Sequence, residues 1–258
     1  MPRTVVITGA SSGIGAEFAR RFGQQGDDVV LVARRLERLE SLAAELRARH
    51  AVTVTPIAAD LTEPRPGETL RRRLTERGIV ADALVNCAGY GRTARFAQTS
   101  GDDVARQIAL DVAALTDVTK AFWPDLLEAE AGLLINVASL TAYAPMPGMA
   151  VYAAAKAFVV SFTEALWAEA HDSRLRVLCL SPGPTRSEFY QTSGSSEQGV
   201  RFQTPEQVVD TAFRALRTGR PTVVSGRTNA ITAALMHSLP RRLVLALTAH
   251  QASKSPAV

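Results

Sequence analysis

Cysteine and histidine are scarce in this sequence. The only cysteines, Cys87 and Cys179, both lie in apolar runs, and the four histidines show no spacing typical of metal ligands. Two reduced, buried thiols exclude a disulfide-stabilised scaffold, and we expect no metal site.

The sequence pattern also predicts neither a long hydrophobic run nor an N-terminal leader. No run approaches the roughly 18–20 consecutive apolar residues of a membrane span. The strand-like run TVVIT begins at residue 4, which leaves no room for a signal peptide. We therefore expect a cytoplasmic protein without integral membrane contact.

The excess of positive charge is small. The formal net charge is +4, and the arginines are interspersed with acidic residues on helical stretches such as RRLERLESLAAELRAR. This pattern is typical of solvated helix surface, so we expect no nucleic-acid partner. With 258 residues, 47% hydrophobic and 21% charged, the chain is long enough for one large α/β domain.

Short β-branched runs alternate with helical patterns along the chain. The predicted strands are TVVIT, DVVLVA, VTVTPIA, ALVNCA, LLINVAS, RVLCLS and TVVSG. Such alternation predicts an α/β fold, a Rossmann-type doubly wound parallel sheet of about seven strands with helices on both faces. We expect residues 1–225 to form the dinucleotide-binding and catalytic domain.

Two regions break this alternation. Residues 184–200 are rich in Ser, Gly and turn formers and predict a mobile loop beside a site. Residues 226–258 predict a C-terminal helical extension, divided at Pro240 and packed on the same domain. Its basic start and apolar continuation also suit surface attachment, although packing over a pocket or a subunit interface is the commoner use.

The first strand leads directly into a glycine-rich turn and an amphipathic helix. The turn, TGASSGIG, contains Gly9, Gly13 and Gly15 together with Ser11, Ser12 and Ile14. Glycine permits a tight turn and close backbone approach, and the free N–H groups of a helix N-terminus favour a pyrophosphate. The position of the turn predicts a dinucleotide site.

The residues at the end of the second strand predict whether the site binds a ribose with a 2′-hydroxyl or with a 2′-phosphate. An acidic residue there would bind a 2′-hydroxyl, but this chain has Ala33 followed by Arg34 and Arg35, which favours NADP. The alternative is that the arginines simply begin a charged helix. After the third strand, Asp60 and Leu61 are expected at the adenine, although Asp60 equally suits the cap of a turn.

Lysine is rare, because only three of the 29 basic residues are lysines, at positions 120, 156 and 254. Lys156 follows Tyr152 by four residues in an apolar helical segment, so the two side chains share one helical face. A cation about 5 Å from a phenol contributes about 3 kcal/mol at an effective dielectric near 20, which favours the phenolate. The alternative is an amphipathic helix edge with an outward-reaching lysine.

Taken together, TGASSGIG, NCAG at 86–89, Ser139, Tyr152-x3-Lys156 and SPGPTRSEF from Ser181 resemble the short-chain dehydrogenase/reductase family over about residues 1–225. The resemblance implies that Tyr152 is the acid/base, that Ser139 holds the substrate oxygen and that Lys156 binds the nicotinamide ribose. It also implies a homodimer or homotetramer. The further cofactor contacts that it implies are Asn86, Ala88, Gly89, Pro182, Gly183, Thr185 and Ser187, of which Asn86 also suits a turn and the last two suit plain loop hydroxyls.

Asp111 departs from the family pattern, which usually has Asn at this fourth catalytic position. In the family this residue bends its helix and its backbone carbonyl holds a water that leads to the lysine. An ionised Asp111 within roughly 7 Å of Lys156 would offset part of the ammonium's effect on Tyr152.

These features predict an NADP(H)-dependent oxidoreductase that interconverts a ketone or aldehyde and its alcohol. The alternative is a cofactor-binding regulator or scaffold without turnover. An apolar substrate is expected if the following residues line the pocket and not the core: Leu140, Tyr143, Met146, Met149, Phe189 and Tyr190.

Overall fold

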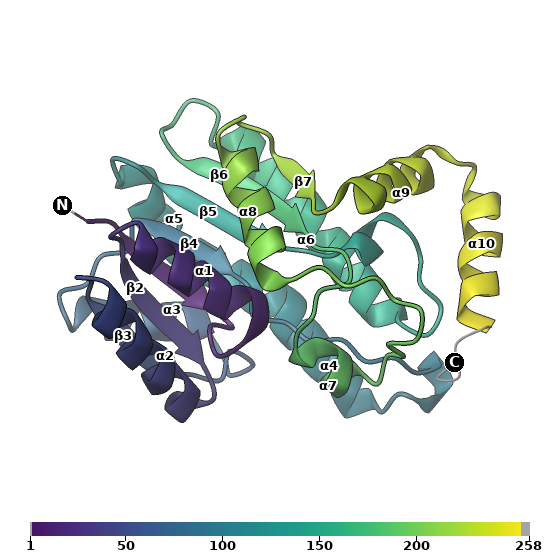
Figure 1. Ribbon diagram of the computed structural model, residues 1–258, viewed down its shortest axis with the longest axis horizontal. Coiled ribbons are helices and arrows are strands. Elements are labelled where there is room, and N and C mark those ends of the chain that lie inside the picture. The colour runs from purple at the N-terminus through teal and green to yellow at the C-terminus, as the bar shows by residue number, and fades with distance from the viewer. Residues whose placement is uncertain (1, 254–258) are drawn as a thin grey trace.

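The computed structural model describes residues 2–253 and contains one seven-stranded parallel sheet (Figure 1). The strand order is β3-β2-β1-β4-β5-β6-β7. This confirms the predicted doubly wound fold. The strands are β1 (Thr4–Thr8), β2 (Asp28–Ala33), β3 (Val54–Ala58), β4 (Ala83–Asn86), β5 (Leu133–Val137), β6 (Arg176–Ser181) and β7 (Thr222–Val224).

The strands are hydrophobic on both faces because helices cover both. Successive residues of a strand point to opposite faces, so Val5 and Ile7 join one core cluster whereas Val6 joins the other. Against the first face pack α1 (Gly13–Gln24), α2 (Leu36–Arg49) and α8 (Pro205–Leu216), which lie in front of the sheet in Figure 1. Against the second pack α3 (Pro66–Thr75), α5 (Leu115–Glu128) and α6 (Ala150–Glu169).

The helix before α5 is not regular. Helix α4 (Gly101–Ile108) continues through a π-helical segment, η2 (Ala109–Ala114), into α5. A π-helical turn inserts an extra residue and bends the axis, and such turns often occur at functional sites. Asp111 lies within this segment, in agreement with the helix bend that the family resemblance implies.

The predicted loop at 184–200 contains a short helix, α7 (Glu188–Ser193). Ser187 caps it by accepting a hydrogen bond from the amide of Phe189, and Gly194 ends it at a φ of 72°. Among the described residues, two short 3-10 turns also occur, η1 (Phe96–Gln98) and η3 (Leu140–Tyr143).

The described part of the C-terminal extension, residues 226–253, forms two helices, α9 (Arg227–Ser238) and α10 (Arg241–Ser253), as the break at Pro240 predicts. The last five residues of the predicted extension lie outside the described residues. They extend from the β7 edge of the sheet (Figure 1). Ala233, Val244 and Thr248 are buried, so both helices contribute side chains to the packed interior.

Helix α6 is long and apolar enough to cross a membrane by length and composition alone, with 20 residues and a mean hydropathy of 1.2. It is not a continuous apolar run, because Lys156, Glu164 and Glu169 interrupt it. Its apolar character has a different use here, because α6 packs against β6 and η3 and carries Tyr152 and Lys156 on its buried side.

Candidate active site

A cavity of about 930 Å³ opens at the carboxyl ends of the strands. Segments that follow β1, β2, β3, β4, β5 and β6 all line it, because parallel strands end at the same edge of a sheet. All but two of the site residues expected from the sequence lie on its wall, and the exceptions are Asn86 and Asp111.

The glycine turn has the geometry of a phosphate-binding loop. Gly9 and Gly13 have φ values of 68° and 54°, a region that side chains disfavour. A Cβ at Gly15 would lie 2.4 Å from the carbonyl oxygen of Gly9, so the turn tolerates no side chain there. Ser12 does not cap the first N–H groups of α1 with its side chain, and this leaves them free to bind a pyrophosphate.

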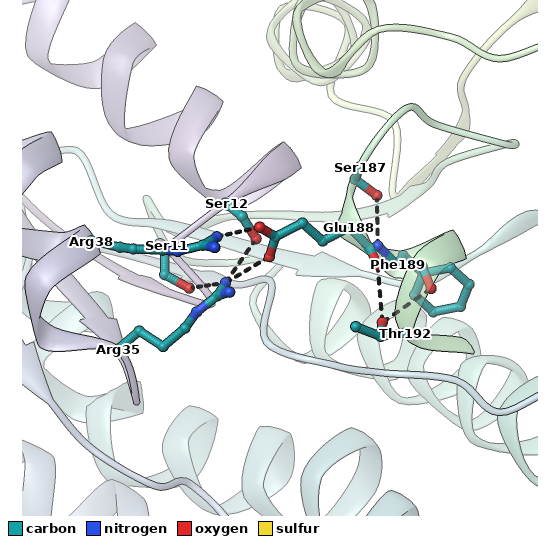
Figure 2. Close-up of polar contacts among 8 residues, drawn as sticks. All are labelled: Ser11, Ser12, Arg35, Arg38, Ser187, Glu188, Phe189 and Thr192. Atoms are coloured by element: carbon teal, nitrogen blue, oxygen red, sulfur yellow. Dashed lines mark hydrogen bonds and ion pairs between the residues drawn. The ribbon is translucent and has the colours of Figure 1, made fainter. Parts of the chain in front are cut away.

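The two arginines after β2 are exposed and line the cavity next to the glycine turn. The guanidinium of Arg35 donates hydrogen bonds to the hydroxyls of Ser11 (3.0 Å) and Ser12 (3.4 Å). It also forms an ion pair with Glu188 (Figure 2). Arg34 lies near enough to Asp60 for its charge to contribute to lowering the pKa of that carboxyl.

Asp60 caps a turn and also faces the cavity. Its Oδ1 accepts hydrogen bonds from the backbone amide of Thr62 (2.9 Å) and from the Thr62 hydroxyl (2.8 Å). The backbone bond is the main reason that the pKa of Asp60 is lowered. The two roles that the sequence left open are therefore compatible.

Tyr152 and Lys156 lie one turn apart on α6 and both are buried. The Nζ atom of Lys156 is 5.6 Å from the centre of the Tyr152 ring and donates a hydrogen bond to the carbonyl of Val137 at the end of β5 (3.2 Å). Ser139 follows β5 on the cavity wall, where its hydroxyl accepts from the amide of Thr141. The side chains of Tyr152 and Lys156 on α6 thus lie together with the residues at the end of β5.

The pKa of Tyr152 is raised, because burial disfavours the phenolate. Lys156 and a hydrogen bond with Ser139 act in the opposite direction, whereas the charge of Asp111 adds to the increase. As expected from the sequence, Lys156 acts to lower the pKa of Tyr152, but the net change in that pKa is an increase. Burial is the larger effect in the protein alone.

Asp111 lies behind Lys156, with its Oδ1 3.4 Å from the ammonium nitrogen. The carboxyl is fully buried, and neither oxygen has a hydrogen bond of ordinary geometry within the part of the chain described. Burial raises the pKa of Asp111, and the Lys156 charge counteracts this. Burial also acts to lower the pKa of Lys156, but Asp111 and Tyr152 outweigh it, so the ammonium is retained.

Gly89 makes room for this pair. A Cβ at this position would lie 2.4 Å from Oδ1 of Asp111 and 3.0 Å from Nζ of Lys156. Of the NCAG segment, Cys87, Ala88 and Gly89 line the cavity. Burial raises the pKa of the Cys87 thiol to about 12, which makes it a poor nucleophile.

The prediction that Asn86 lines the adenosine side of the site is wrong. Its side-chain amide donates to Thr119 on α5 and to Asn136 on β5, both at 2.9 Å, and the residue is buried. Asn136 in turn donates to Thr163 on α6. Asn86 therefore joins two strands and two helices beneath the cavity floor, because a side chain inside β4 points into the layers and not beyond the strand end.

Thr185 and Ser187 lie on the cavity wall, and each also has a local partner. The Thr185 hydroxyl donates to the carbonyl of Gly183 at 2.9 Å, and Ser187 caps α7. Pro182 and Gly183 line the same wall. Both hydroxyls thus form hydrogen bonds within the loop, the alternative that the sequence left open, and both residues line the cavity.

The other end of the cavity is apolar. Leu140, Tyr143, Met146, Met149, Phe189 and Tyr190 all line it. The ring of Phe189 packs on that of Tyr152 with centroids 5.3 Å apart. Sequence reasoning missed four residues that the C-terminal helices bring to this wall, for which only the apolar pattern of the extension was a signal: Thr232, Ala233, Met236 and Thr248.

Known proteins are similar to this chain in sequence and in fold. A serine 3-dehydrogenase from Agrobacterium fabrum is 34% identical over 223 residues, which cover 83% of this chain and 87% of the relative. The structure of a short-chain dehydrogenase from Sphingobium yanoikuyae in complex with NADPH has a TM-score of 0.81 and 34% identity, and covers 93% of this chain and 97% of its own.

A further solved structure is that of a bulky-bulky ketone specific alcohol dehydrogenase from Comamonas testosteroni. It has a TM-score of 0.77 and 29% identity, and covers 97% of this chain and 92% of its own. The family model described as "short chain dehydrogenase" matches residues 3–198. The chain therefore belongs to the short-chain dehydrogenase/reductase family of oxidoreductases.

Proposed function

We propose that this protein is an NADP(H)-dependent oxidoreductase that interconverts a ketone or aldehyde and its alcohol. The observation that carries the proposal is that Ser139, Tyr152 and Lys156 line one cavity together with the glycine turn. Bound nicotinamide would supply or accept the hydride at the substrate carbon.

Tyr152 moves the proton in this proposal. In reduction its phenol donates a proton to the carbonyl oxygen, and in oxidation its phenolate accepts the proton of the alcohol. Ser139 donates a hydrogen bond to the same oxygen and orients it. Lys156 lowers the cost of the phenolate and holds the ribose, and its Val137 contact fixes the ammonium in place.

The preference for NADP rests on Arg34 and Arg35, which lie on the cavity wall next to the glycine turn. Guanidinium groups bind phosphate in a bidentate manner, and no acidic residue follows β2 directly to bind a 2′-hydroxyl. The Sphingobium yanoikuyae structure, which contains NADPH, supports this preference.

The substrate that suits the cavity is bulky and uncharged. Phe189 and Tyr190 line the cavity together with Met and Leu side chains, and Glu188, their charged neighbour on α7, is paired with Arg35 and Arg38. A zwitterion such as serine would need a counter-charge among these apolar side chains, whereas a neutral ketone would not. The Comamonas testosteroni relative, specific for bulky-bulky ketones, is the better guide.

A homodimer or homotetramer is part of the proposal. Ile108 on α4, Leu127 on α5 and Phe158 on α6 are large apolar side chains that are between 38% and 46% exposed. Phe158 stacks on Phe162, with centroids 5.6 Å apart. Light scattering after size exclusion would test this, and a monomer at micromolar concentration would contradict it.

The test of the function is NADPH oxidation with a panel of ketones and aldehydes that range from small and charged to bulky and apolar. We expect turnover with bulky neutral ketones and nearly none in Tyr152→Phe, which keeps the ring but loses the proton donor. NADPH binding by Tyr152→Phe should stay within a few-fold. Tight NADPH binding without turnover on any substrate would favour the alternative, a cofactor-binding regulator or scaffold.

A further inference from the structure

Glu188, the first residue of α7, lines the cavity and points toward Arg35 and Arg38 (Figure 2). Its Oε2 lies 2.9 Å from Nη2 of Arg35, and its Oε1 contacts Nη1 of Arg38. Both arginines hold the pKa of the Glu188 carboxyl below its usual range, so it is ionised at neutral pH.

The ion pair is connected to the phosphate-binding turn. The Nη2 atom of Arg35 that faces Glu188 also donates to the hydroxyls of Ser11 and Ser12. The preceding residue of the loop, Ser187, lies against the same turn, since a Cβ at Gly13 would be 3.0 Å from the Ser187 Cβ. The start of α7 is therefore attached to the turn by charge and by contact.

The other side of α7 faces the catalytic group. Phe189, the neighbour of Glu188, packs on the ring of Tyr152, and Tyr190 lines the apolar end of the cavity. A change in the position of Glu188 would thus move residues that touch both the acid/base and the substrate.

A 2′-phosphate and the Glu188 carboxylate need the same guanidinium groups. Both are anions that accept paired N–H bonds from arginine, and a phosphate monoester carries about 1.5–2 negative charges at neutral pH. A 2′-hydroxyl makes no such demand. If the 2′-phosphate of NADP binds to Arg35, it must compete with the Glu188 carboxylate for that guanidinium. NAD has no 2′-phosphate and does not compete with Glu188.

We propose that Glu188 is a cofactor-specificity residue that occupies Arg35 and Arg38 in the cofactor-free protein and is displaced by the 2′-phosphate, which releases the start of α7 from the phosphate-binding turn. The proposal rests on the proposed use of NADP. Glu188 lowers the affinity for NADP in particular and couples cofactor binding to the loop that covers the substrate.

The first test measures the binding of adenosine 2′,5′-bisphosphate and of ADP, as well as NADPH and NADH, to cofactor-free protein by calorimetry. Glu188→Gln should bind the two 2′-phosphate ligands about two- to fivefold more tightly, the range expected for an exposed ion pair, with NADH and ADP within about twofold. The matched control, Glu197→Gln, removes the same charge from an exposed position in the same loop and should change none of the four.

The second test measures amide hydrogen exchange of residues 188–193, a readout that does not depend on enzyme activity. Adenosine 2′,5′-bisphosphate should speed exchange there in the unmodified protein, ADP should not, and Glu188→Gln should exchange fast from the start. Slower exchange with the bisphosphate, or equal weakening of all four ligands by Glu188→Gln, would overturn displacement and leave Glu188 as a loop anchor.

These outcomes separate the two proposals. If the unmodified protein prefers 2′-phosphate ligands and Glu188→Gln leaves that preference unchanged, the inference is wrong while the NADP assignment stands. If the unmodified protein shows no preference at all, the cofactor assignment fails and this inference fails with it.

Discussion

Asp111 and Lys156 form a buried ion pair, with Oδ1 3.4 Å from Nζ, and the same ammonium lies 5.6 Å from the centre of the Tyr152 ring. The cation that favours the Tyr152 phenolate is thus shared with a carboxylate. A shared cation is less effective, because the negative charge of Asp111 raises the pKa of Tyr152 while Lys156 lowers it.

Asp111→Asn should therefore change the pH dependence of alcohol oxidation. Oxidation needs the phenolate, so its rate rises as the pH passes the pKa of Tyr152. Removing the Asp111 charge lowers that pKa, and the rising limb of the pH–rate profile should move to lower pH, with a several-fold faster rate near neutrality.

The matched control is Asp102→Asn, which makes the same charge change at an exposed position on α4. Its profile should overlap that of the unmodified enzyme. If Asp111→Asn also overlaps, then Asp111 is protonated in the site, and its charge has no part in setting the pKa of Tyr152.

Gly89→Ala should disrupt the same pair by steric means. The new methyl would lie 2.4 Å from Oδ1 of Asp111 and 3.0 Å from Nζ of Lys156, so one of the two side chains must move. We expect kcat to fall at least about tenfold, because a small misplacement of a catalytic group is costly. Gly101→Ala, where no atom lies within 4 Å of the added Cβ, should keep full activity. Unchanged kcat in Gly89→Ala would show that the position of the ammonium is not critical.

Arg34→Ala should weaken NADPH binding and spare NADH. Loss of one charge-assisted contact to the 2′-phosphate costs on the order of 1.5–3 kcal/mol, or roughly 10- to 150-fold in affinity. Titration of both cofactors measures this. Arg49→Ala removes the same charge from the last turn of α2 and should affect neither. Equal loss of both cofactors in Arg34→Ala would mean that Arg34 supports the fold and not the phosphate.

Asn86→Ala should lower stability and not cofactor affinity. It removes the buried N–H donor that Asn136 Oδ1 and Thr119 Oγ1 share, at a cost of about 1–3 kcal/mol in the free energy of unfolding. Urea unfolding measures that cost, and NADPH titration of the folded variant provides the contrast. A stable variant that has lost NADPH affinity would restore Asn86 to the cofactor site.

Local sequence patterns were sufficient to predict the strands and the residues that follow each strand end. The strands follow from short β-branched runs, and the glycine turn follows from three glycines between a strand and a helix. The shared face of Tyr152 and Lys156 follows from the 3.6-residue period, and none of these needs knowledge of distant segments. Parallel strands end at one edge, so Gly9, Arg34, Asp60 and Ser139 were bound to meet once the fold was a doubly wound sheet.

Only the tertiary structure decided which groups lie behind that edge and what charge they bear. Asn86 points into the layers, Asp111 reaches Lys156 across 45 positions of sequence, and Glu188 meets Arg38 across 150. The direction of the Tyr152 pKa depends on burial by segments as distant as α7, and burial is a property of packing. Pattern in a sequence extends over a turn or a strand, whereas desolvation and ion pairing depend on distances that only the folded chain sets.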